Sequence, residues 1–324
     1  MKYKWAIIGT GNIASQMAEA LAVIPEAELI AVLSRTKENA RVFAEKYNIP
    51  HIYTERELFA QSDLFDIVYV ATPHTQHFDD TNLCLLHKKH VLCEKPMCLN
   101  ANQSAVLYEL AKAQGCFLME AMWTRFFPAI IKAKALIEEG KIGAVKQVKA
   151  DFCFKGPYNA EGRHLNKELA GGALLDVGIY PIYFSQIILE QKPILIQGAA
   201  HIGKTGVDEQ SAYLLQYDNG IIANLSSAVQ TNTIQDAFVY GDEGYIHIPK
   251  FWQPDSFTLV KKGKEEVFEF ERLGNGYTYE VLEVHKCIEQ NMFFSEILTP
   301  EKSIEVMAIM DEIRKDWGVV YPGE

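Results

Sequence analysis

The chain has 324 residues, of which 48% are hydrophobic and 23% charged, and its formal net charge is -11. This composition is typical of a soluble globular protein with room for two domains, and it excludes a disordered or fibrous protein. Because a net negative charge repels phosphate polymers and anionic membranes, we expect neither nucleic acid nor a membrane as a partner.

The sequence also predicts where the protein works. The N-terminus has no long apolar segment followed by a cleavage site, and we expect no stretch of membrane-spanning length. The six cysteines include no C-x-x-C pair and are too few for a disulfide scaffold. We therefore predict reduced thiols and a cytoplasmic protein.

Residues 3 to 120 alternate short aliphatic or β-branched runs with longer segments of helical period. The predicted strands are 3–8, 29–33, 66–71, 90–94 and 117–120, and the predicted helices between them are 12–22, 37–47, 75–86 and 100–114. Strands and helices in regular succession predict a doubly wound α/β domain, in which crossover helices cover both faces of a parallel sheet.

The second half of the chain has a different pattern. After a predicted helix near 125–138, runs of alternating residues are separated by turn signals at 218–220, 241–244 and 262–264, which predict an antiparallel sheet. Further helices are predicted over 168–189, 277–290 and 301–317. No flexible linker separates the halves, so we predict domains over 1–122 and 123–324 with a packed junction.

A glycine motif follows the first predicted strand and begins the first helix, where residues 9–14 match G-x-G-x-x-A. The first glycine permits the tight turn, the second lets the backbone approach a pyrophosphate, and the small Ala14 permits close helix packing. The motif in this place predicts a dinucleotide site. The predicted contacts are Gly9, Thr10, Gly11, Asn12 and Ile13.

The second predicted strand ends at Ser34 and Arg35, where NAD enzymes usually have an acidic residue for the ribose 2′-hydroxyl. A small residue followed by a guanidinium leaves room and charge for a 2′-phosphate. We therefore predict that NADP is preferred over NAD. The alternative is that Arg35 is only a solvated loop residue.

Two histidines lie three residues apart after the 66–71 strand. Thr72, His74 and His77 are at the carboxyl end of that strand, the edge where a dinucleotide lies. We predict contacts with the nicotinamide ribose for these residues, with loop packing as the alternative. No metal site is predicted, because no third ligand has usable spacing.

Glu94, Lys95 and Pro96 end the 90–94 strand at the same edge of the sheet, beside the nicotinamide half of a bound dinucleotide. A lysine between a cofactor and low-dielectric walls can have its pKa lowered, or can lower the pKa of a neighbour. Glu94 and Lys95 are therefore candidate site residues. The alternative is an ordinary surface ion pair.

Several of these segments together resemble the Gfo/Idh/MocA family of nicotinamide-dependent oxidoreductases. The segments are IIGTGNIA at 7–14, VATPHTQH at 70–77 and LCEKP at 92–96. Those at 117–128, 171–182 and 321–324 resemble the branch that contains dimeric dihydrodiol dehydrogenase and NADP-dependent D-xylose dehydrogenase. The resemblance implies a Rossmann domain followed by an α/β domain with a large, open, mostly antiparallel sheet, which often forms a dimer. We therefore expect a homodimer.

The resemblance also implies catalytic roles for Lys95, Asp176 and Tyr180, the last two from a D-x-x-x-[HY] motif. Many family members have His where this chain has Tyr180, and this departure removes a His-based proton relay. Because Asp176 and Tyr180 are four apart in a predicted helix, they are expected to face the same way.

A mechanism follows for these three residues. We predict that Tyr180 takes the proton of the substrate hydroxyl, that Lys95 favours the phenolate, and that Asp176 orients a second hydroxyl. The alternative is that Tyr180 is a core aromatic residue. Trp123 and Arg125 are predicted by resemblance to line the substrate side, with core packing as the alternative for Trp123.

The predicted function is hydride transfer between NADP and an aldose sugar or a vicinal diol. One alternative is a regulator of the same fold that binds nucleotide without turnover, although Lys95, Asp176 and Tyr180 are all present. Another is a glycosidase that uses tightly held NAD, although Arg35 does not favour NAD.

Overall fold

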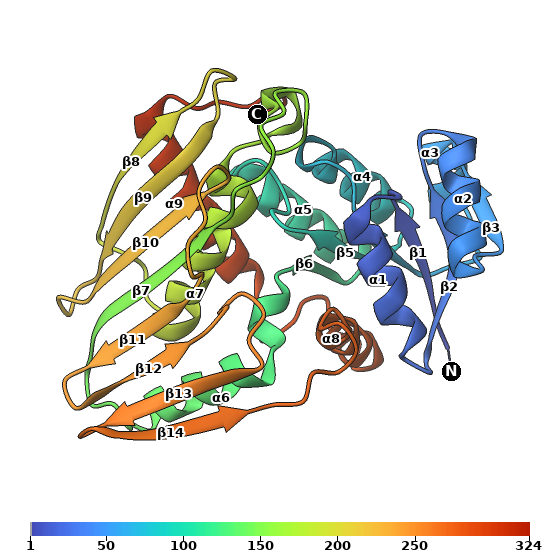
Figure 1. The fold of residues 1–324 in the computed structure, drawn as a ribbon. Helices are drawn as coiled ribbons and strands as arrows, with labels where there is room; N and C mark the ends of the chain where they lie inside the picture. Colours follow the sequence, from blue (N-terminus) through green and yellow to red (C-terminus); the bar gives the residue numbers. More distant parts are fainter. Residues whose placement is uncertain (1) are drawn as a thin grey trace. The chain divides into compact units, whose positions relative to one another are not determined.

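The computed structural model describes residues 2–324, which form two units with one sheet each (Figure 1). The first unit contains residues 2–98, Asn102–Trp123 and Arg272–Ser303. The second contains Leu99–Ala101, Thr124–Glu271 and Ile304–Glu324. Each unit is thus assembled from segments that are distant in the sequence.

The sheet of the first unit has six parallel strands in the order β3-β2-β1-β4-β5-β6. Its strands are β1 (Tyr3–Ile8), β2 (Ala27–Leu33), β3 (His51–Tyr53), β4 (Ile67–Val70), β5 (His90–Glu94) and β6 (Leu118–Ala121). The helices between them are α1 (Asn12–Ala22), α2 (Lys37–Tyr47), α3 (Arg56–Ala60), α4 (His74–Leu86) and α5 (Ala101–Gln114). This confirms the predicted doubly wound sheet. The short β3 and α3 were not predicted, because elements of this length show too little periodicity.

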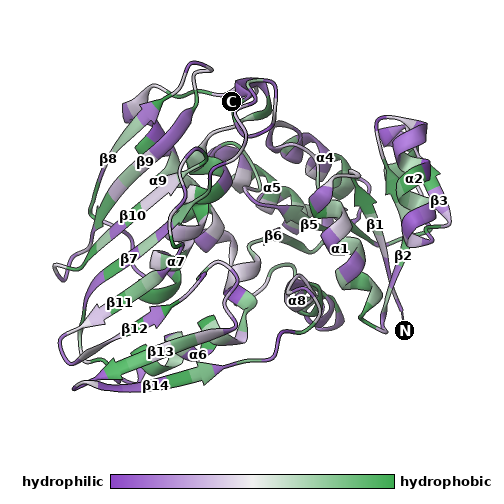
Figure 2. Cartoon of the chain, viewed as in Figure 1, coloured by the Kyte–Doolittle hydropathy of each residue, from purple (hydrophilic) through white to green (hydrophobic). Residues whose placement is uncertain are grey.

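The inner strands of this sheet are hydrophobic because helices cover both of their faces. The last four residues of β1 and all four residues of β4 are buried. In Figure 2, the arrowhead end of β1 is green, whereas α2 has purple patches. The amphipathic α2 begins at Thr36, whose side chain accepts a hydrogen bond from the Asn39 amide at 3.2 Å.

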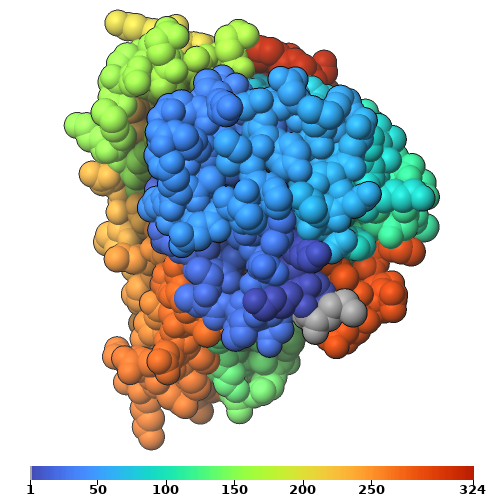
Figure 3. All heavy atoms as spheres, turned by 90° about the vertical axis from the view of Figure 1, so that its right-hand side faces the viewer, coloured from blue at the N-terminus to red at the C-terminus, as the bar shows by residue number. Residues whose placement is uncertain are grey.

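A helix from the second half of the sequence completes the first unit. Helix α8 (Thr278–Glu289) packs against α1, and Figure 3 shows it in orange beside the N-terminal strand. The indole of Trp5 donates to Nε2 of His285 at 2.9 Å, and the ring of Tyr3 stacks on the same imidazole at 3.9 Å. His285 is therefore held as a neutral acceptor in the core.

The second unit has an eight-stranded sheet in the order β14-β13-β12-β11-β7-β10-β9-β8. The strands are β7 (Val145–Cys153), β8 (Leu195–Ile202), β9 (Asp208–Gln216), β10 (Ile222–Ala228), β11 (Ala237–Gly241), β12 (Gly244–Ile248), β13 (Ser256–Lys261) and β14 (Lys264–Glu269). The pair β7–β10 is parallel and the other neighbouring pairs are antiparallel, which confirms a large, mostly antiparallel sheet.

The remaining helices include one irregular segment. They are η1 (Trp123–Phe126), α6 (Pro128–Glu138), η2 (Lys167–Leu169), the π-helix η3 (Leu174–Gly178), α7 (Ile179–Leu189) and α9 (Pro300–Trp317). The region predicted as one helix over 168–189 is therefore three consecutive helices of different type. A π-helix has a wider turn than an α-helix, and such turns are frequent at functional sites.

The segment Lys167–Leu189 corrects the expectation that no stretch approaches membrane-spanning length. It is long and apolar enough to cross a membrane, but 94% of its most hydrophobic window is buried inside the structure. Every residue of α7 is buried, and the helix packs on β7 and β10. Its hydrophobicity is therefore that of a core helix.

The buried imidazole predicts a pH-dependent stability. Burial lowers the pKa of His285 to about 4, whereas a histidine in an unfolded chain titrates near 6.5. As the pH falls from about 6.5 to about 4, the unfolded state takes up a proton that the folded state does not. The free energy of unfolding that His285 contributes is therefore lost over this range. We expect the difference in urea midpoint between wild type and His285→Gln to shrink from pH 7 to pH 5. The exposed His201→Gln serves as the control, and an equal difference at both pH values would contradict the assignment.

Candidate active site

The residues predicted to bind a dinucleotide lie at one edge of the first sheet. Parallel strands all end at the same edge, and the loops after β1, β2, β4 and β5 carry these residues. The backbone joins the loops directly: the Gly9 amide donates to the Leu33 carbonyl at 2.9 Å and the Ala71 amide to the Ile8 carbonyl at 2.9 Å. The edge is therefore one continuous surface of loops.

The glycine loop has the shape that a pyrophosphate requires. Gly9 has φ of +109°, and a Cβ there would lie 2.5 Å from the Ala71 carbonyl oxygen, so only glycine fits. A Cβ at Gly11 would meet nothing within 4 Å, which leaves open space beside the first turn of α1. The N-cap residue of α1 is Gly11, which has no side chain to bind the amides of the first turn. That turn also contains no acidic residue. The loop thus fits a dinucleotide, with its phosphates at the positive end of the helix.

The residues after β2 lie beside the glycine loop, and their predicted contact with a 2′-phosphate stays a prediction. The Ser34 hydroxyl lies 3.3 Å from the Thr10 hydroxyl, which joins this loop to the glycine loop. Arg35 is exposed in the loop just before α2. The next arginine, Arg41, is bound by Glu38 at 2.8 Å and Glu45 at 2.5 Å. Arg35 is therefore the better placed of the two to meet a 2′-phosphate.

The loop after β4 is bound to the segment that contains Lys95. One ring nitrogen of the buried His77 lies 2.8 Å from the Thr72 carbonyl oxygen and the other lies 2.8 Å from the Pro96 carbonyl oxygen. The Thr72 hydroxyl donates to Asp80 at 2.8 Å. His77 thus connects the starts of two loops, and its predicted contact with the cofactor stays a prediction. His74 begins α4, with its ring edge-on to that of His77.

Glu94 is buried and its carboxylate is fixed at both oxygens. The phenol of the fully buried Tyr69 donates to one oxygen, and the amide of Lys95 donates to the other at 3.1 Å. Because the carboxylate and the Lys95 backbone are bound to each other, the lysine leaves the strand in one defined direction. Lys95 is partly exposed.

Two further buried carboxyl groups, Glu120 and Glu280, lie near this motif, and no sequence pattern pointed to either. Glu120 on β6 accepts a hydrogen bond from the Met97 amide at 3.0 Å and another from the Ser303 hydroxyl. Burial, followed by the charge of Glu94, raises the pKa of Glu280 on α8 well above its usual value. Only the fold brings α8, and with it Glu280, to the motif.

The two residues predicted to line the substrate side lie in different units. Trp123 belongs to the first unit, where its ring packs on Tyr277 with centroids 4.3 Å apart. Arg125 belongs to the second unit, where its guanidinium donates to Gln186 and lies 5.7 Å from the Tyr183 ring. Both side chains are buried, and their predicted substrate contacts stay predictions.

Asp176 lies in the π-helix of the second unit and is only 3% exposed. Arg163 contacts one of its oxygens at 3.3 Å, and Nε2 of His164 lies 3.7 Å from the other. These two basic residues come from the loop before η2, and no sequence pattern pointed to them. A buried carboxylate paired with an arginine has a preferred direction, which suits a group that positions a ligand hydroxyl.

Tyr180 lies in the first turn of α7 and faces an aromatic cluster. Its ring is 5.2 Å from that of Phe152 and 6.4 Å from that of Trp252, and these two rings stack at 4.7 Å. The Trp252 indole donates to Gln235 at 3.1 Å. The sequence analysis missed Phe152 and Trp252, whose strand and loop are far from 180 in the sequence. The Tyr180 ring therefore packs against a stacked pair of aromatic rings.

The structure therefore assembles the predicted residues in two groups. The first unit contains the glycine loop, Ser34, Arg35, Thr72, the two histidines, Glu94 and Lys95, whereas the second contains Arg125, Asp176 and Tyr180. The predicted action of Lys95 on Tyr180 joins residues of different units and stays a prediction.

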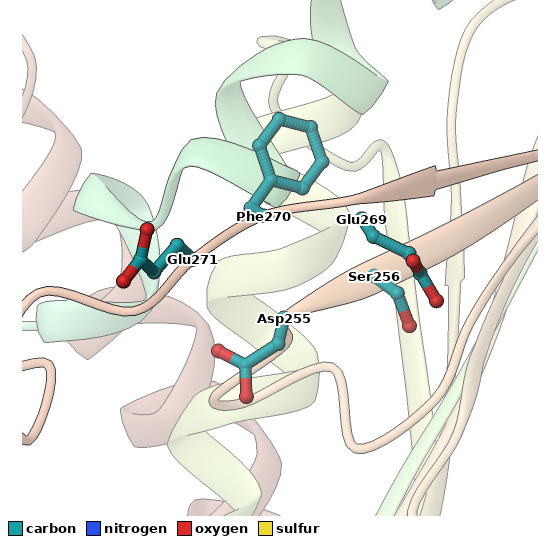
Figure 4. Close-up of a pocket in the computed structure, with 5 residues that line it drawn as sticks. All are labelled: Asp255, Ser256, Glu269, Phe270 and Glu271. Carbon is teal, nitrogen blue, oxygen red and sulfur yellow. The ribbon is translucent and has the colours of Figure 1, made fainter.

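A separate pocket of about 420 Å³ lies beside β13 and β14 in the second unit. Figure 4 shows the carboxylates of Asp255, Glu269 and Glu271 pointing in different directions around Phe270, so they do not converge on one ligand. Among residues 2–324, no group of three or more His, Cys, Asp or Glu side chains is placed to hold a metal ion. The six cysteines are buried free thiols.

Two family models match the chain. The model described as an oxidoreductase family with an NAD-binding Rossmann fold matches residues 3–122, and the GFO/IDH/MocA C-terminal domain matches residues 130–247. The two matches follow the order of the predicted cofactor and substrate halves.

Proteins with similar sequences and structures are dehydrogenases and oxidoreductases. Trans-1,2-dihydrobenzene-1,2-diol dehydrogenase of Mus musculus is 35% identical over 333 residues, which cover 99% of both chains. The NADP(+) scyllo-inositol 2-dehydrogenase of Bacillus subtilis is 34% identical over 328 residues, again 99% of both chains. The aldose-aldose oxidoreductase of Caulobacter crescentus, crystallised with glycerol, is 25% identical with a TM-score of 0.89, over 97% of both chains.

Proposed function

Because the chain belongs to the Gfo/Idh/MocA family of oxidoreductases, we propose that it is an NADP-dependent dehydrogenase of an aldose sugar or a vicinal diol. One observation carries the proposal: the buried, fixed carboxylate of Asp176 comes one turn before the phenol of Tyr180. A carboxylate that accepts from one hydroxyl and a phenol that takes the proton of a second suit a substrate with two adjacent hydroxyls.

The substrate class also has support from the relatives. A dihydrobenzene diol and an inositol, which the mouse and Bacillus enzymes are named for, are both six-membered rings with adjacent hydroxyls. The aromatic cluster of Phe152, Tyr180 and Trp252 supplies flat apolar surface for the face of such a ring. A ring with adjacent hydroxyls is therefore the first substrate class to test.

The cofactor is proposed to bind at the carboxyl edge of the first sheet. The amides of the glycine loop hold the pyrophosphate, and Ser34 and Arg35 receive the 2′-phosphate. The bound NADP⁺ supplies the acceptor for a hydride. Residues 1–122 thus form the proposed cofactor domain, and residues 123–324 form the proposed substrate and dimer domain.

Proton transfer is proposed to depend on Tyr180. A phenol ordinarily titrates near 10, so a nearby positive charge must stabilise its ionised form at neutral pH. We propose that the ammonium of Lys95 supplies this charge, while Asp176 holds the second hydroxyl and so fixes which carbon is oxidised. Glu94 and Tyr69 hold the Lys95 backbone in place.

We further propose a cytoplasmic homodimer formed through the eight-stranded sheet. Alternate residues of β9 and β10 are buried, and between them Leu214 and Ile222 are 45% and 41% exposed. The Phe238 ring stacks on His247 at 4.3 Å on the neighbouring strands β11 and β12. An exposed apolar sheet face of this kind supports association with a second copy.

The proposal predicts reduction of NADP⁺ by one substrate class. Purified protein is mixed with NADP⁺ or NAD⁺ and a panel of aldoses and cyclic vicinal diols, and nicotinamide absorbance is followed. We expect reduction that needs NADP⁺ and a sugar or diol. Binding without turnover of any substrate would instead favour the regulator. Tightly retained NAD in the purified protein would favour the glycosidase.

The position of Arg35 predicts the cofactor preference. Replacing Arg35 with Asp removes a charged donor and adds a repelling charge, so the preference for NADP⁺ over NAD⁺ should fall roughly ten- to a hundredfold in kcat/KM. Lys132→Asp, an equal charge change at an exposed position of α6, is the control. An unchanged preference in Arg35→Asp would make Arg35 a solvated loop residue.

The proton-transfer role predicts a specific loss in Tyr180→Phe. This variant keeps the aromatic ring and removes the base, so kcat should fall roughly a hundredfold or more, the usual contribution of such a group. Tyr217→Phe is the matched control, since that buried phenol donates to Ser185 at 3.3 Å. If Tyr180→Phe keeps a normal kcat, the base assignment is wrong and the proton-transfer role passes to Lys95. In that case Lys95→Met should lose activity while Tyr180→Phe does not.

A further inference from the structure

Two glycines precede the π-helix that carries Asp176, and both are closely surrounded. A Cβ at Gly171 would lie 2.9 Å from the His164 carbonyl oxygen. Gly172 has φ of +122°, and a Cβ there would contact the Asp208 carboxylate and lie 3.0 Å from the Tyr321 hydroxyl. The backbone at this junction is therefore fixed on one side by the loop that holds Asp176 and on the other by Asp208 and Tyr321.

Asp208 binds the start of the π-helix. Its carboxylate accepts a hydrogen bond from the Leu174 amide at 2.7 Å and is only 1% exposed. Burial raises the pKa of Asp208 to about 7, although the backbone amides of Leu174 and Ala173 oppose the shift. Because the folded-state pKa is raised, the folded state keeps a proton that the unfolded state loses between about pH 4 and pH 7, so folding stability falls over that range. A buried acid that lowers stability indicates a role other than stability.

Tyr321 binds Gly171, which lies just before the start of the π-helix. Its phenol donates to the Gly171 carbonyl at 2.8 Å, and its ring is buried. The segment of residues 319–324 is held in turn: Glu324 accepts from the Tyr321 amide at 3.1 Å and forms an ion pair with Arg314. Arg314 also donates to the Leu99 carbonyl at 2.7 Å. The YPGE sequence is thus attached to the framework of the second unit.

The contacts form one path to the carboxylate. The Asp176 amide donates to the Gly172 carbonyl at 3.3 Å, so a shift of Gly172 is passed on to Asp176. At the other end of the π-helix, the Tyr213 phenol donates to the Gly178 carbonyl at 3.0 Å. The π-helix is therefore bound at both ends by side chains that do not belong to it.

We propose that Asp208 and Tyr321 are positioning residues that set where the Asp176 carboxylate lies, and that residues 319–324 are required for substrate binding for this reason. The inference rests on the proposed role of Asp176 with a substrate hydroxyl. Both residues act through the backbone of Gly171 to Leu174, so the proposal requires neither to touch substrate.

The first test is Tyr321→Phe, which removes one hydroxyl from a buried contact. The Gly171 carbonyl is then left without its donor, and the KM for the sugar or diol should rise about tenfold, the scale of a lost buried hydrogen bond. The value of kcat should change less than KM. Tyr217→Phe, the same change at a phenol bound to Ser185, should leave both constants unchanged.

A double-mutant cycle separates positioning from general weakening. If Tyr321 acts through Asp176, Tyr321→Phe should have no further effect on kcat/KM in the Asp176→Asn background. Effects that add in full would overturn the proposal. Asp208→Asn, which keeps an oxygen acceptor for the Leu174 amide, should lose less activity than Asp208→Ala.

Hydrogen exchange tests the same claim without turnover. Amides of residues 172–178 should exchange faster in Tyr321→Phe than in wild type, and not in Tyr217→Phe. Unchanged exchange would overturn the positioning role. If wild type oxidises no sugar or diol, the proposed function fails, while exchange still decides whether Tyr321 positions the π-helix.

Discussion

In a parallel sheet all strands end at the same edge, and this constraint fixes where the first unit can bind a ligand. The order β3-β2-β1-β4-β5-β6 places the Ser34–Arg35 loop beside the glycine loop, and the loop of Thr72 between the glycine loop and the Glu94–Lys95 motif. The amides at the start of α1 and the exposed Arg35 are both positive in character. An anionic dinucleotide therefore meets favourable groups at more than one loop.

Buried carboxyl groups fix the other chemical residues. Glu94 is bound by Tyr69 and the Lys95 amide, Asp176 by Arg163 and His164, and Asp208 by the Leu174 amide. A buried carboxyl group without partners would be costly, so each of these acids has a defined geometry with its donors. The acids thereby set the direction of the backbone around Lys95 and around the π-helix.

The sequence predicted the parts of this structure that depend on local patterns. Hydrophobic periodicity located α1 and α2 residue for residue, and the glycine motif located the loop where only glycine fits. The π-helix was not predicted, because a local widening of the turn leaves no distinct hydrophobic period. Tyr69, Arg163 and His164 were missed because their roles arise from contacts between segments far apart or outside any motif.

Hydride transfer from a hydroxyl-bearing carbon to NADP⁺ is the central claim, and an isotope follows it directly. The protein would be incubated with NADP⁺ and a sugar or cyclic diol carrying deuterium on the carbon to be oxidised, and the mass of the reduced cofactor would be measured. The account predicts reduced cofactor with one deuterium and a product that has lost it. Substrate converted without deuterium in the cofactor, or no reduced cofactor with any sugar or diol, would contradict it.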